Sequence, residues 1–472
     1  MKAILDLVAH HKAGEPCGIY SVCSAHALVI EAALLHTLRR GAPFALIEAT
    51  SNQVNQEGGY TGMQPAGFRE FVHQIADRVG LSRHRVLLGG DHLGPNAWQA
   101  LPVEDAMARA EVLIDDYVRA GFRKIHLDCS MRCADDPAAL SDEMIARRAA
   151  RLCAVAEGAH ARTGGEPPVY VIGTEVPTPG GAAEDLSTVA VTTSQAARTT
   201  IDTHRVIFAE AGLGTAWPRV IAAVVQPGVE FDHRRVVGYD SAKARALSRM
   251  IEQCDGLVFE AHSTDYQAPA ALAALVRDHF AILKVGPALT FALREALWGL
   301  DAIEREWIKP ALVSGFRNIV VARTKADPRH WSKYYHAAGG ELDYDLQYSL
   351  SDRIRYYWPD PVIVPAQDKM FRNLMQKPPP DALISQYLPI AHLALRDGLI
   401  QNSPAALAMA HVCAVLDGYH AATFAQSSWP PPDLMRGLSR PSPPWPRQKD
   451  VDARPKAGHD DGAEDDRAHQ TT

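Results

Sequence analysis

The fold of this 472-residue chain is indicated by the stretch Arg85-Val-Leu-Leu-Gly-Gly-Asp-His-Leu-Gly-Pro95, in which a short apolar run leads into a polar pair and a turn. Branched and aliphatic residues favour a buried strand, and the Gly-Pro that follows is typical of a strand end. Asp91 and His92 come directly after the apolar run. The stretch therefore predicts a strand that carries titratable groups at its carboxyl end.

Seven further apolar runs repeat this pattern, and segments with helical spacing, such as residues 106–120 and 241–254, lie between them. Near-continuous apolar strands are typical of a parallel sheet that is covered by helices. Eight alternating units favour a closed barrel, and no GxGxxG follows the first run to support a dinucleotide-binding sheet. We therefore predict an α/β fold, a (β/α)8 TIM barrel. The predicted strands are Cys17–Cys23, Phe44–Ala49, Arg85–Gly90, Lys124–Asp128, Val169–Glu175, Val220–Val225, Leu257–Ala261 and Ala281–Val285.

The rest of the chain has a different composition. We assign residues 1–300 to the barrel and residues 301–426 to a helical accessory region that packs on it, because no further strand–helix series follows the eighth run. From 427 to 472 the sequence is rich in Pro, Asp, Arg and Gly. Such a segment buries too little apolar surface to offset its ordering entropy, so we expect a disordered tail.

Bulk properties exclude some classes of function. A net charge of −7 argues against a nucleic-acid-binding face, and no uninterrupted apolar run is long enough to span a membrane. The N-terminus lacks the long apolar stretch of a secretory signal. The seven cysteines are scattered and odd in number, which favours reduced thiols and a cytoplasmic protein.

Histidines and carboxylates gather at the predicted strand ends, where barrel enzymes carry their active sites. This mixture suits a divalent ion such as Zn²⁺, Mn²⁺ or Co²⁺, which can stabilise the enediolate of a sugar. We predict His92 and His262 as metal ligands, and Asp91 and Asp128 as groups that move protons. Glu175 is a further catalytic candidate, either as a base or as a ligand.

Other strand-end residues have two interpretations. His126 shares a face with Asp128 and is either a ligand or a layer residue inside the barrel. His233 lies beyond its strand and is either a ligand or a surface residue. For Glu48, a buried carboxylate paired with a neighbouring strand is slightly favoured over a substrate contact.

Cationic side chains are candidates for contact with substrate. Lys284 either forms a Schiff base, which needs a depressed pKa, or pairs with a phosphate or a barrel carboxylate, and the metal-type surroundings favour pairing. Arg353 and Arg355 suit bidentate phosphate contact or pack the accessory region on the barrel. The glycines of loop 55–62 either cradle phosphate or form a plain turn. The predicted substrate-binding set is Glu48, Asn52, Ser130, Gln226, Lys284, Arg353 and Arg355.

Seven long blocks of the sequence resemble the GatZ/KbaZ family, the accessory subunits of tagatose-1,6-bisphosphate aldolase. The resemblance covers about residues 1–425, and the tail has no counterpart. The blocks are Ser21-Val-Cys-Ser-Ala-His26, Ile47-Glu-Ala-Thr-Ser-Asn-Gln-Val-Asn55, Gly89-Gly-Asp-His-Leu-Gly-Pro-Asn96, Ile172-Gly-Thr-Glu-Val-Pro177, Val225-Gln-Pro-Gly-Val-Glu-Phe-Asp-His233, Glu260-Ala-His-Ser-Thr-Asp-Tyr-Gln267 and Ser349-Leu-Ser-Asp-Arg-Ile-Arg-Tyr-Tyr-Trp-Pro359.

The resemblance implies a barrel related to class II, metal-dependent aldolases. In those enzymes a strand-end Asp-His pair supplies a proton carrier and a zinc ligand, and the pair matches Asp91 and His92. A later strand-end ligand matches His262. The third ligand lies in a His-Gly-x-Tyr element, and the comparable stretch here, residues 225–228, has no His. The residues that could replace it are Gln226, Glu175 and His233.

The resemblance also implies two activities. Some members act alone as D-tagatose 6-phosphate 4-epimerases that produce D-fructose 6-phosphate, and this is the function we expect first. Others support a separate catalytic class II aldolase subunit, for example in galactitol breakdown. A third, weaker hypothesis is a phosphosugar aldolase. The expected partners are a ketose phosphate, a catalytic aldolase subunit in the accessory role, and a possible homo-oligomer.

Overall fold

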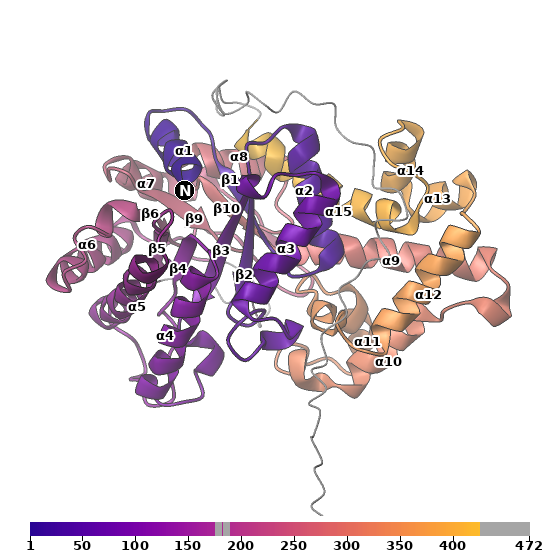
Figure 1. Ribbon diagram of the computed structural model, residues 1–472, viewed down its shortest axis with the longest axis horizontal. Coiled ribbons are helices and arrows are strands. Elements are labelled where there is room, and N and C mark those ends of the chain that lie inside the picture. The colour runs from indigo at the N-terminus through magenta and orange to yellow at the C-terminus, as the bar shows by residue number, and fades with distance from the viewer. Residues whose placement is uncertain (175–181, 183–188, 425–472) are drawn as a thin grey trace, which may run out of the picture.

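The protein, seen here in a computed structural model, is a closed barrel with a helical region on one side (Figure 1). The structure describes residues 1–174, 182 and 189–424. Eight parallel strands close in the order β1-β10-β9-β6-β5-β4-β3-β2, which confirms the predicted TIM barrel. The barrel strands are β1 (Ile19–Cys23), β2 (Ala45–Thr50), β3 (Val86–Leu93), β4 (Lys124–Leu127), β5 (Val169–Gly173), β6 (Val220–Val224), β9 (Val258–Ala261) and β10 (Ile282–Val285).

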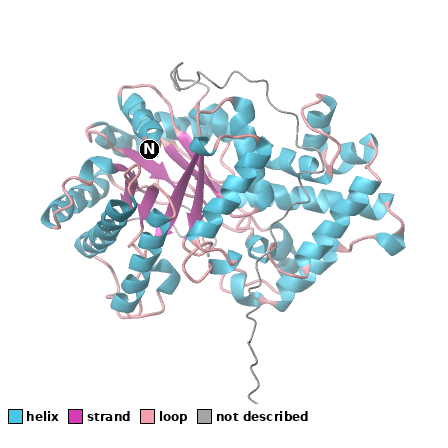
Figure 2. Ribbon diagram, viewed as in Figure 1, coloured by secondary structure: helices cyan, strands magenta, loops and turns pink. Residues whose placement is uncertain are grey.

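Helices cover the outside of the barrel (Figure 2). Their starts follow sequence signals: Ser141, Thr193 and Asp240 each accept a hydrogen bond from a backbone N–H in the first turn of the helix that follows. A short antiparallel hairpin, β7 (Glu230–Phe231) and β8 (Val236–Val237), extends the segment after β6. The helices of this part are α1 (Lys2–Lys12), α2 (Ala27–Arg40), α3 (Pro65–Val79), α4 (Val103–Arg119), α5 (Asp142–Thr163), α6 (Ser194–Glu210), α7 (Ser241–Glu252) and α8 (Pro269–Arg277).

After β10 the chain leaves the barrel and later returns to it. Helix α9 (Pro287–Trp307) leads into the helical region at the right of Figure 1, and α15 (Pro404–Thr423) packs against α2, α8 and α9. The Gly18 N–H donates to the Thr423 carbonyl, which ties the end of α15 to the start of β1. The outer layer thus includes a helix from the end of the described chain. The other helices are α10 (Phe316–Ala326), α11 (Gly339–Tyr348), α12 (Ile363–Gln376), α13 (Asp381–Tyr387) and α14 (Pro389–Arg396).

Parts of the sequence-based prediction fall where the structure gives no description. The tail 427–472 lies outside the described residues, and the division into a barrel and an accessory region at residue 300 stays a prediction. Among the described residues, no helix combines the length and the apolar character that crossing a membrane requires.

Candidate metal centre

The end of β3 brings two consecutive side chains to one pocket. Successive residues of a regular strand point to opposite faces, yet Asp91 and His92 both line the same cavity. The pairing of β3 with β4 shifts register between Gly90 and Leu93, and His92 has a φ of 50°. Bulges and left-handed backbone re-aim side chains at functional sites, and this one explains how both residues reach the cavity.

Beyond the bulge, β3 passes unusually close to the end of β4. A Cβ placed on Gly94 would lie 1.7 Å from the carbonyl oxygen of Asp128, so only glycine fits there. This approach lets Asp128 Oδ2 accept a hydrogen bond from His92 Nδ1 at 2.7 Å. A carboxylate in this position fixes the imidazole so that Nε2 is the nitrogen left for a ligand. Asp128 also accepts hydrogen bonds from the backbone and hydroxyl of Ser130.

Three imidazole rings face one another beneath the cavity. The ring centroids of His92, His126 and His262 are separated by 4.9 to 5.2 Å. His262 Nε2 lies 2.9 Å from Glu260 Oε1, and His126 Nδ1 lies 3.1 Å from Asp91 Oδ1. One ligand atom from each of four residues falls within 4.8 Å of the others. These four, which we call the ligand cluster, are Asp91, His126, Glu260 and His262.

Two buried lysines lie against the same carboxylates. Lys124 Nζ is 2.8 Å from Glu48 Oε1 and 2.6 Å from Glu260 Oε2. Lys284 Nζ contacts Glu48 and lies 2.9 Å from Asp91 Oδ1. Gly89 leaves room for this arrangement, because a Cβ there would lie 2.7 Å from the Glu48 side chain. The charged cluster, as we use the term, consists of Glu48, Asp91, Lys124, Asp128, Glu260 and Lys284.

With the neighbouring imidazoles neutral, the charged cluster carries two more negative than positive charges, since four carboxylates face two ammonium groups, and every member is buried. Uncompensated buried charge is costly, so a cation is expected there. The nearby donors are imidazole and carboxylate, and His126 Nε2 is buried with no hydrogen-bond partner. Zn²⁺, Mn²⁺ and Co²⁺ accept this donor set. The residues present therefore fit a divalent ion.

The buried charges shift the pKa values of the side chains at the site. Burial alone would raise the pKa of Asp91, but the charges of His92 and Lys284 outweigh it and hold that pKa well below its usual range. Burial would lower the pKa of His92, but Asp91 and Asp128 raise it. For Lys284, the neighbouring carboxylates outweigh burial and raise the pKa well above its usual value. A protonated amine cannot attack a carbonyl, so these contacts argue for the pairing role of Lys284.

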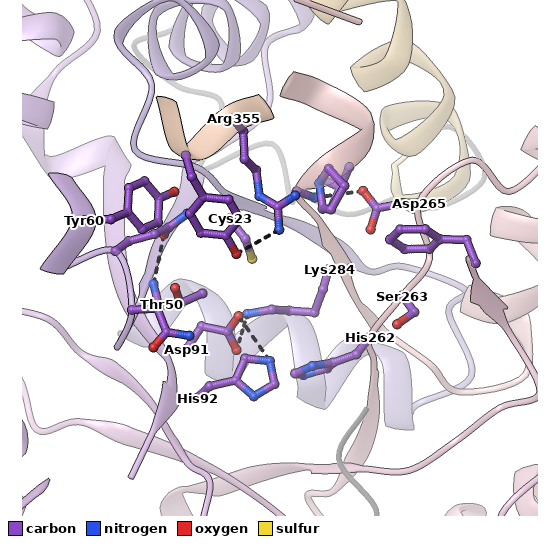
Figure 3. Close-up of a pocket in the computed structure, with 17 residues that line it drawn as sticks. Cys23, Thr50, Tyr60, Asp91, His92, His262, Ser263, Asp265, Lys284 and Arg355 are labelled. Atoms are coloured by element: carbon purple, nitrogen blue, oxygen red, sulfur yellow. Dashed lines mark hydrogen bonds and ion pairs between the residues drawn. The ribbon is translucent and has the colours of Figure 1, made fainter. Parts of the chain in front are cut away.

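The cavity above the ligand cluster has a second side, which carries Arg355 and the carboxylate Asp265. Figure 3 shows Asp91, His92 and His262 on one side of it and Arg355 on the other. Asn52 also lines it, together with Gly286 at the start of α9. The cavity encloses about 80 Å³ and shares wall residues with a pocket of about 570 Å³ between α2, α3 and α12. A ligand in the cavity therefore has room to extend away from the ligand cluster.

Arg355 belongs to a short helical turn, Arg353–Tyr357, that the helical region contributes. Arg355 and Arg353 both donate to the hydroxyl of Tyr356, at 3.2 and 3.4 Å. Burial raises the pKa of Tyr356, but the two guanidinium charges outweigh it and lower that pKa. Arg353 does not line the cavity, and its guanidinium stacks 3.2 Å from the centre of the Tyr334 ring.

The remaining predicted residues lie away from the cavity or outside the description. Gln226 Oε1 accepts hydrogen bonds from the backbone N–H groups of Gly228 and Val229, so it holds its own turn. His233 packs on Tyr335 and lies 3.4 Å from hydroxyls of the helical region. Glu175 lies outside the described residues.

Two members of the charged cluster were not among the predicted site residues. Glu260 lies two residues before His262, and Lys124 lies two residues before His126. Residues two apart on a strand share a face, so both point into the barrel beneath the strand-end groups. A charged residue two positions before a strand-end histidine lies on the same inward face of the strand. This spacing could therefore have predicted both residues from the sequence.

Asp352, next to Arg353, is a buried carboxylate that gives a pH-dependent prediction. Burial is the largest influence on it and raises its pKa to about 6, although Arg355 lies nearby and the Thr290 hydroxyl donates to it. The folded pKa exceeds the unfolded value of about 3.9, so the stabilisation is complete below pH 4 and is lost as pH rises through 6. We expect Asp352→Asn to stabilise the protein by about 1–3 kcal/mol at pH 8 and by much less at pH 4.

Urea unfolding of wild type and Asp352→Asn at both pH values measures this difference. Asp327→Asn is the matched control, because the pKa of the Asp327 carboxylate is lowered, mainly by a hydrogen bond from Arg329. An equal effect of Asp352→Asn at both pH values would contradict the linkage.

The chain is similar to one protein family and to several solved structures. Residues 4–424 match the family described as D-tagatose-1,6-bisphosphate aldolase subunit GatZ/KbaZ-like. A solved structure named as a probable tagatose 6 phosphate kinase from Sinorhizobium meliloti 1021 is 50% identical, with 86% of this chain and 100% of that chain covered and a TM-score of 0.79. The fructuronate-tagaturonate epimerase UxaE from Cohnella laeviribosi is 14% identical, with 86% and 81% covered and a TM-score of 0.46. The match of the family over nearly all described residues, together with the 50% identity, shows that the chain belongs to the GatZ/KbaZ-like family.

Proposed function

We propose that the protein is a metal-dependent epimerase that converts D-tagatose 6-phosphate to D-fructose 6-phosphate by inverting C4. The observation that carries the proposal is the charged cluster with its neighbouring imidazoles at the mouth of a barrel whose opposite wall carries Arg355. A protein that only supports a partner has no need to keep such a costly set of buried charges beneath an open cavity.

The chemistry follows from the substrate. The hydrogen on C4 is not acidic, so direct deprotonation is unattractive. Removal of the O4 proton and cleavage of C3–C4 leave an enediolate and an aldehyde, and re-addition to the other face of the aldehyde inverts C4. No net oxidation occurs, and the proton taken from O4 returns to O4.

The bound ion would be held by His92 and His262 together with Glu260. Bound there, it supplies a Lewis acid that stabilises negative charge on the oxygens of the ketose fragment. His126 completes the ring of donors or supports it from below, in keeping with its position in the ligand cluster.

Asp91 is the group that we assign to the O4 proton. It lines the cavity beside the other members of the ligand cluster, where its carboxylate can accept a proton from a substrate hydroxyl. Asp128 acts through His92, whose ring it orients, and is a positioning residue. Arg355 would hold the phosphate, so that the aldehyde fragment stays bound while its C4 rotates.

An accessory role is the second candidate, because the matching family is described as an aldolase subunit. In that case the partner is a catalytic class II aldolase subunit. The cavity would then serve stability or recognition.

Purified protein with Zn²⁺, Mn²⁺ or Co²⁺ and D-tagatose 6-phosphate separates the candidates. We expect D-fructose 6-phosphate, measured by a coupled isomerase and dehydrogenase assay, and no deuterium at C4 when the reaction runs in D₂O. Deuterium at C4 would refute the cleavage mechanism. No turnover until an aldolase subunit is added, followed by higher activity or lifetime of that subunit, would refute the epimerase and support the accessory role.

A further inference from the structure

Inversion of C4 by cleavage and re-addition requires proton transfer at O4 on two sides of the substrate. In the proposed epimerase the ketose end lies at the metal side and Arg355 holds the phosphate, so C4 lies between the two sides of the cavity. When the aldehyde turns over, its oxygen moves from one side of C4 to the other. A proton carrier works only within hydrogen-bond reach, about 2.6–3.2 Å. Asp91 therefore serves one orientation of O4, and the other orientation needs a second group.

Asp265 is a second carboxylate in the wall of this cavity. It follows β9 and lines the same cavity as Asp91. Figure 3 shows Asp265 on the side of Arg355, across the cavity from Asp91. The backbone around it is left-handed at Ser263, with a φ of 53°, and at Tyr266, with a φ of 63°. Such conformations are costly for residues other than glycine and cluster at functional sites. The loop thus follows a strained path that places a carboxylate opposite Asp91.

One oxygen of Asp265 is fixed by the start of α9. Oδ1 accepts hydrogen bonds from the backbone N–H groups of Gly286, at 3.0 Å, and of Ala288, at 2.8 Å. Both bonds go to the same oxygen, so they hold the carboxylate in place and do not occupy Oδ2. Asp265 is only 3% exposed, and it lines the cavity, so a ligand reaches it from there. A side chain held in this way can meet a substrate hydroxyl without losing its contacts with α9.

The surroundings of Asp265 suit a group that carries a proton. Burial is the largest influence and raises its pKa to about 6, against the two N–H groups of α9 and the charge of Arg355. Glu230, Tyr266 and Tyr419 also interact with its charge. A carboxyl group with a pKa near the working pH is populated in both protonation states, which favours general acid–base catalysis. Asp265 can therefore accept a proton in one direction of the reaction and donate one in the other.

Beyond the proposed metal ligands, other titratable side chains of the cavity wall suit this role less well. Burial raises the pKa of Cys23 and that of Tyr60, so neither ionises readily. The ammonium group of Lys284 is already paired with two carboxylates. The hydroxyl of Tyr356 already accepts hydrogen bonds from two arginines. Tyr356 can still donate its own proton, which makes it the main rival of Asp265.

We propose that Asp265 is a second catalytic residue of the epimerisation and transfers the O4 proton in the epimer whose O4 points away from Asp91. This assignment rests on the proposed function. In one turnover the C3–C4 bond breaks and re-forms, one carboxylate takes a proton from O4, and the other carboxyl group gives one to O4. The number of protons on O4 is unchanged, and exchange with solvent returns both carboxyl groups to their starting states.

Single turnovers of the full-length protein, loaded with the divalent ion, test the role of Asp265. Excess enzyme is mixed with D-tagatose 6-phosphate or D-fructose 6-phosphate, quenched with acid, and assayed for glyceraldehyde 3-phosphate, the aldehyde fragment of C3–C4 cleavage. Asp265→Asn keeps an oxygen for the α9 hydrogen bonds but cannot carry a proton. We expect it to cleave one ketose at least about 100-fold more slowly than wild type, and the other within about fivefold. The aldehyde should accumulate from the second ketose, because closure to the other epimer is blocked.

The ratio of the two cleavage rates within one preparation does not depend on how much of the protein is folded or loaded with metal. Asp240→Asn is the matched control, because Asp240 also accepts a hydrogen bond from the first turn of a helix, α7, but does not line the cavity. It should cleave both ketoses at the wild-type rate.

Three results would overturn the assignment of Asp265. Unchanged cleavage of both ketoses by Asp265→Asn would show that the carboxylate carries no proton, and equal slowing of both would indicate a structural role. Unequal cleavage by Tyr356→Phe instead of Asp265→Asn would make Tyr356 the carrier. These results leave the epimerase itself intact. A wild-type protein that cleaves neither ketose would refute the epimerase and the role of Asp265 together.

Discussion

His92→Ala protein is expected to purify without a bound divalent ion and to lose about 1000-fold or more in kcat/KM for D-tagatose 6-phosphate. The physical reason is the position of His92 between two carboxylates. Asp128 fixes the ring through Nδ1, Nε2 lies 3.8 Å from Asp91 Oδ2, and the ring lies 4.9 Å from that of His262. Lewis-acid stabilisation by an ion is worth several kcal/mol, and each 1.4 kcal/mol is a factor of ten in rate. Metal content by mass spectrometry and steady-state kinetics measure the two effects.

Two variants separate a ligand from its surroundings. Asp128→Asn keeps the imidazole but weakens its orientation, so metal affinity should fall only about 10- to 100-fold. His233→Ala removes a histidine that contacts the helical region, and the metal content should remain that of wild type. A His92→Ala protein with a full equivalent of metal and a normal rate would contradict the assignment of His92 as a metal ligand. Loss of metal from His233→Ala would show that the ligands include a residue far from the cluster.

The barrel could be predicted because its strands are marked by composition. All eight apolar runs form strands, since a strand buried on both faces must be apolar along its length. The local geometry of β3 could not be predicted. Its strand continues to Leu93, through the register shift at Asp91 and His92, and the shift arises from how β3 meets β4. Likewise, the sequence predicts a helical region at residues 301–426 but does not indicate that its last helix, α15, packs beside α2 and α8 on the barrel.

The candidate site could be predicted in part for a similar reason. Position at a strand end identified Asp91, His92 and His262, which line one cavity. It also suggested Gln226, whose side chain instead bonds its own turn, because a sequence does not show which way a loop residue points. Lys124 lies at the start of β4, and its position in the sequence did not predict it as a site residue. In the structure it lies inside the barrel and contacts Glu48.

Lys124→Met is expected to destabilise the protein by about 3–5 kcal/mol, the second large effect that the structure predicts. Lys124 is fully buried and lies between Glu48 and Glu260, and the charge of Glu260 in particular raises its pKa against the effect of burial. Methionine fills a similar volume, so packing changes little. The loss comes from two buried carboxylates that are left with one ammonium group, that of Lys284, between them. Urea unfolding measures it.

A second substitution tests whether charge balance is the cause. Glu48→Gln in the Lys124→Met protein restores the original net charge of the cluster, so the double variant should regain a large part of the lost stability. The double-mutant cycle then gives a coupling energy of about 1–3 kcal/mol between the two sites. The single variant should also recover as pH falls, because its unpaired glutamates accept protons more readily than those of wild type. Additive effects of the two substitutions would mean that Lys124 acts by packing alone. They would also contradict the idea that the cluster has an excess of negative charge for the proposed ion to neutralise.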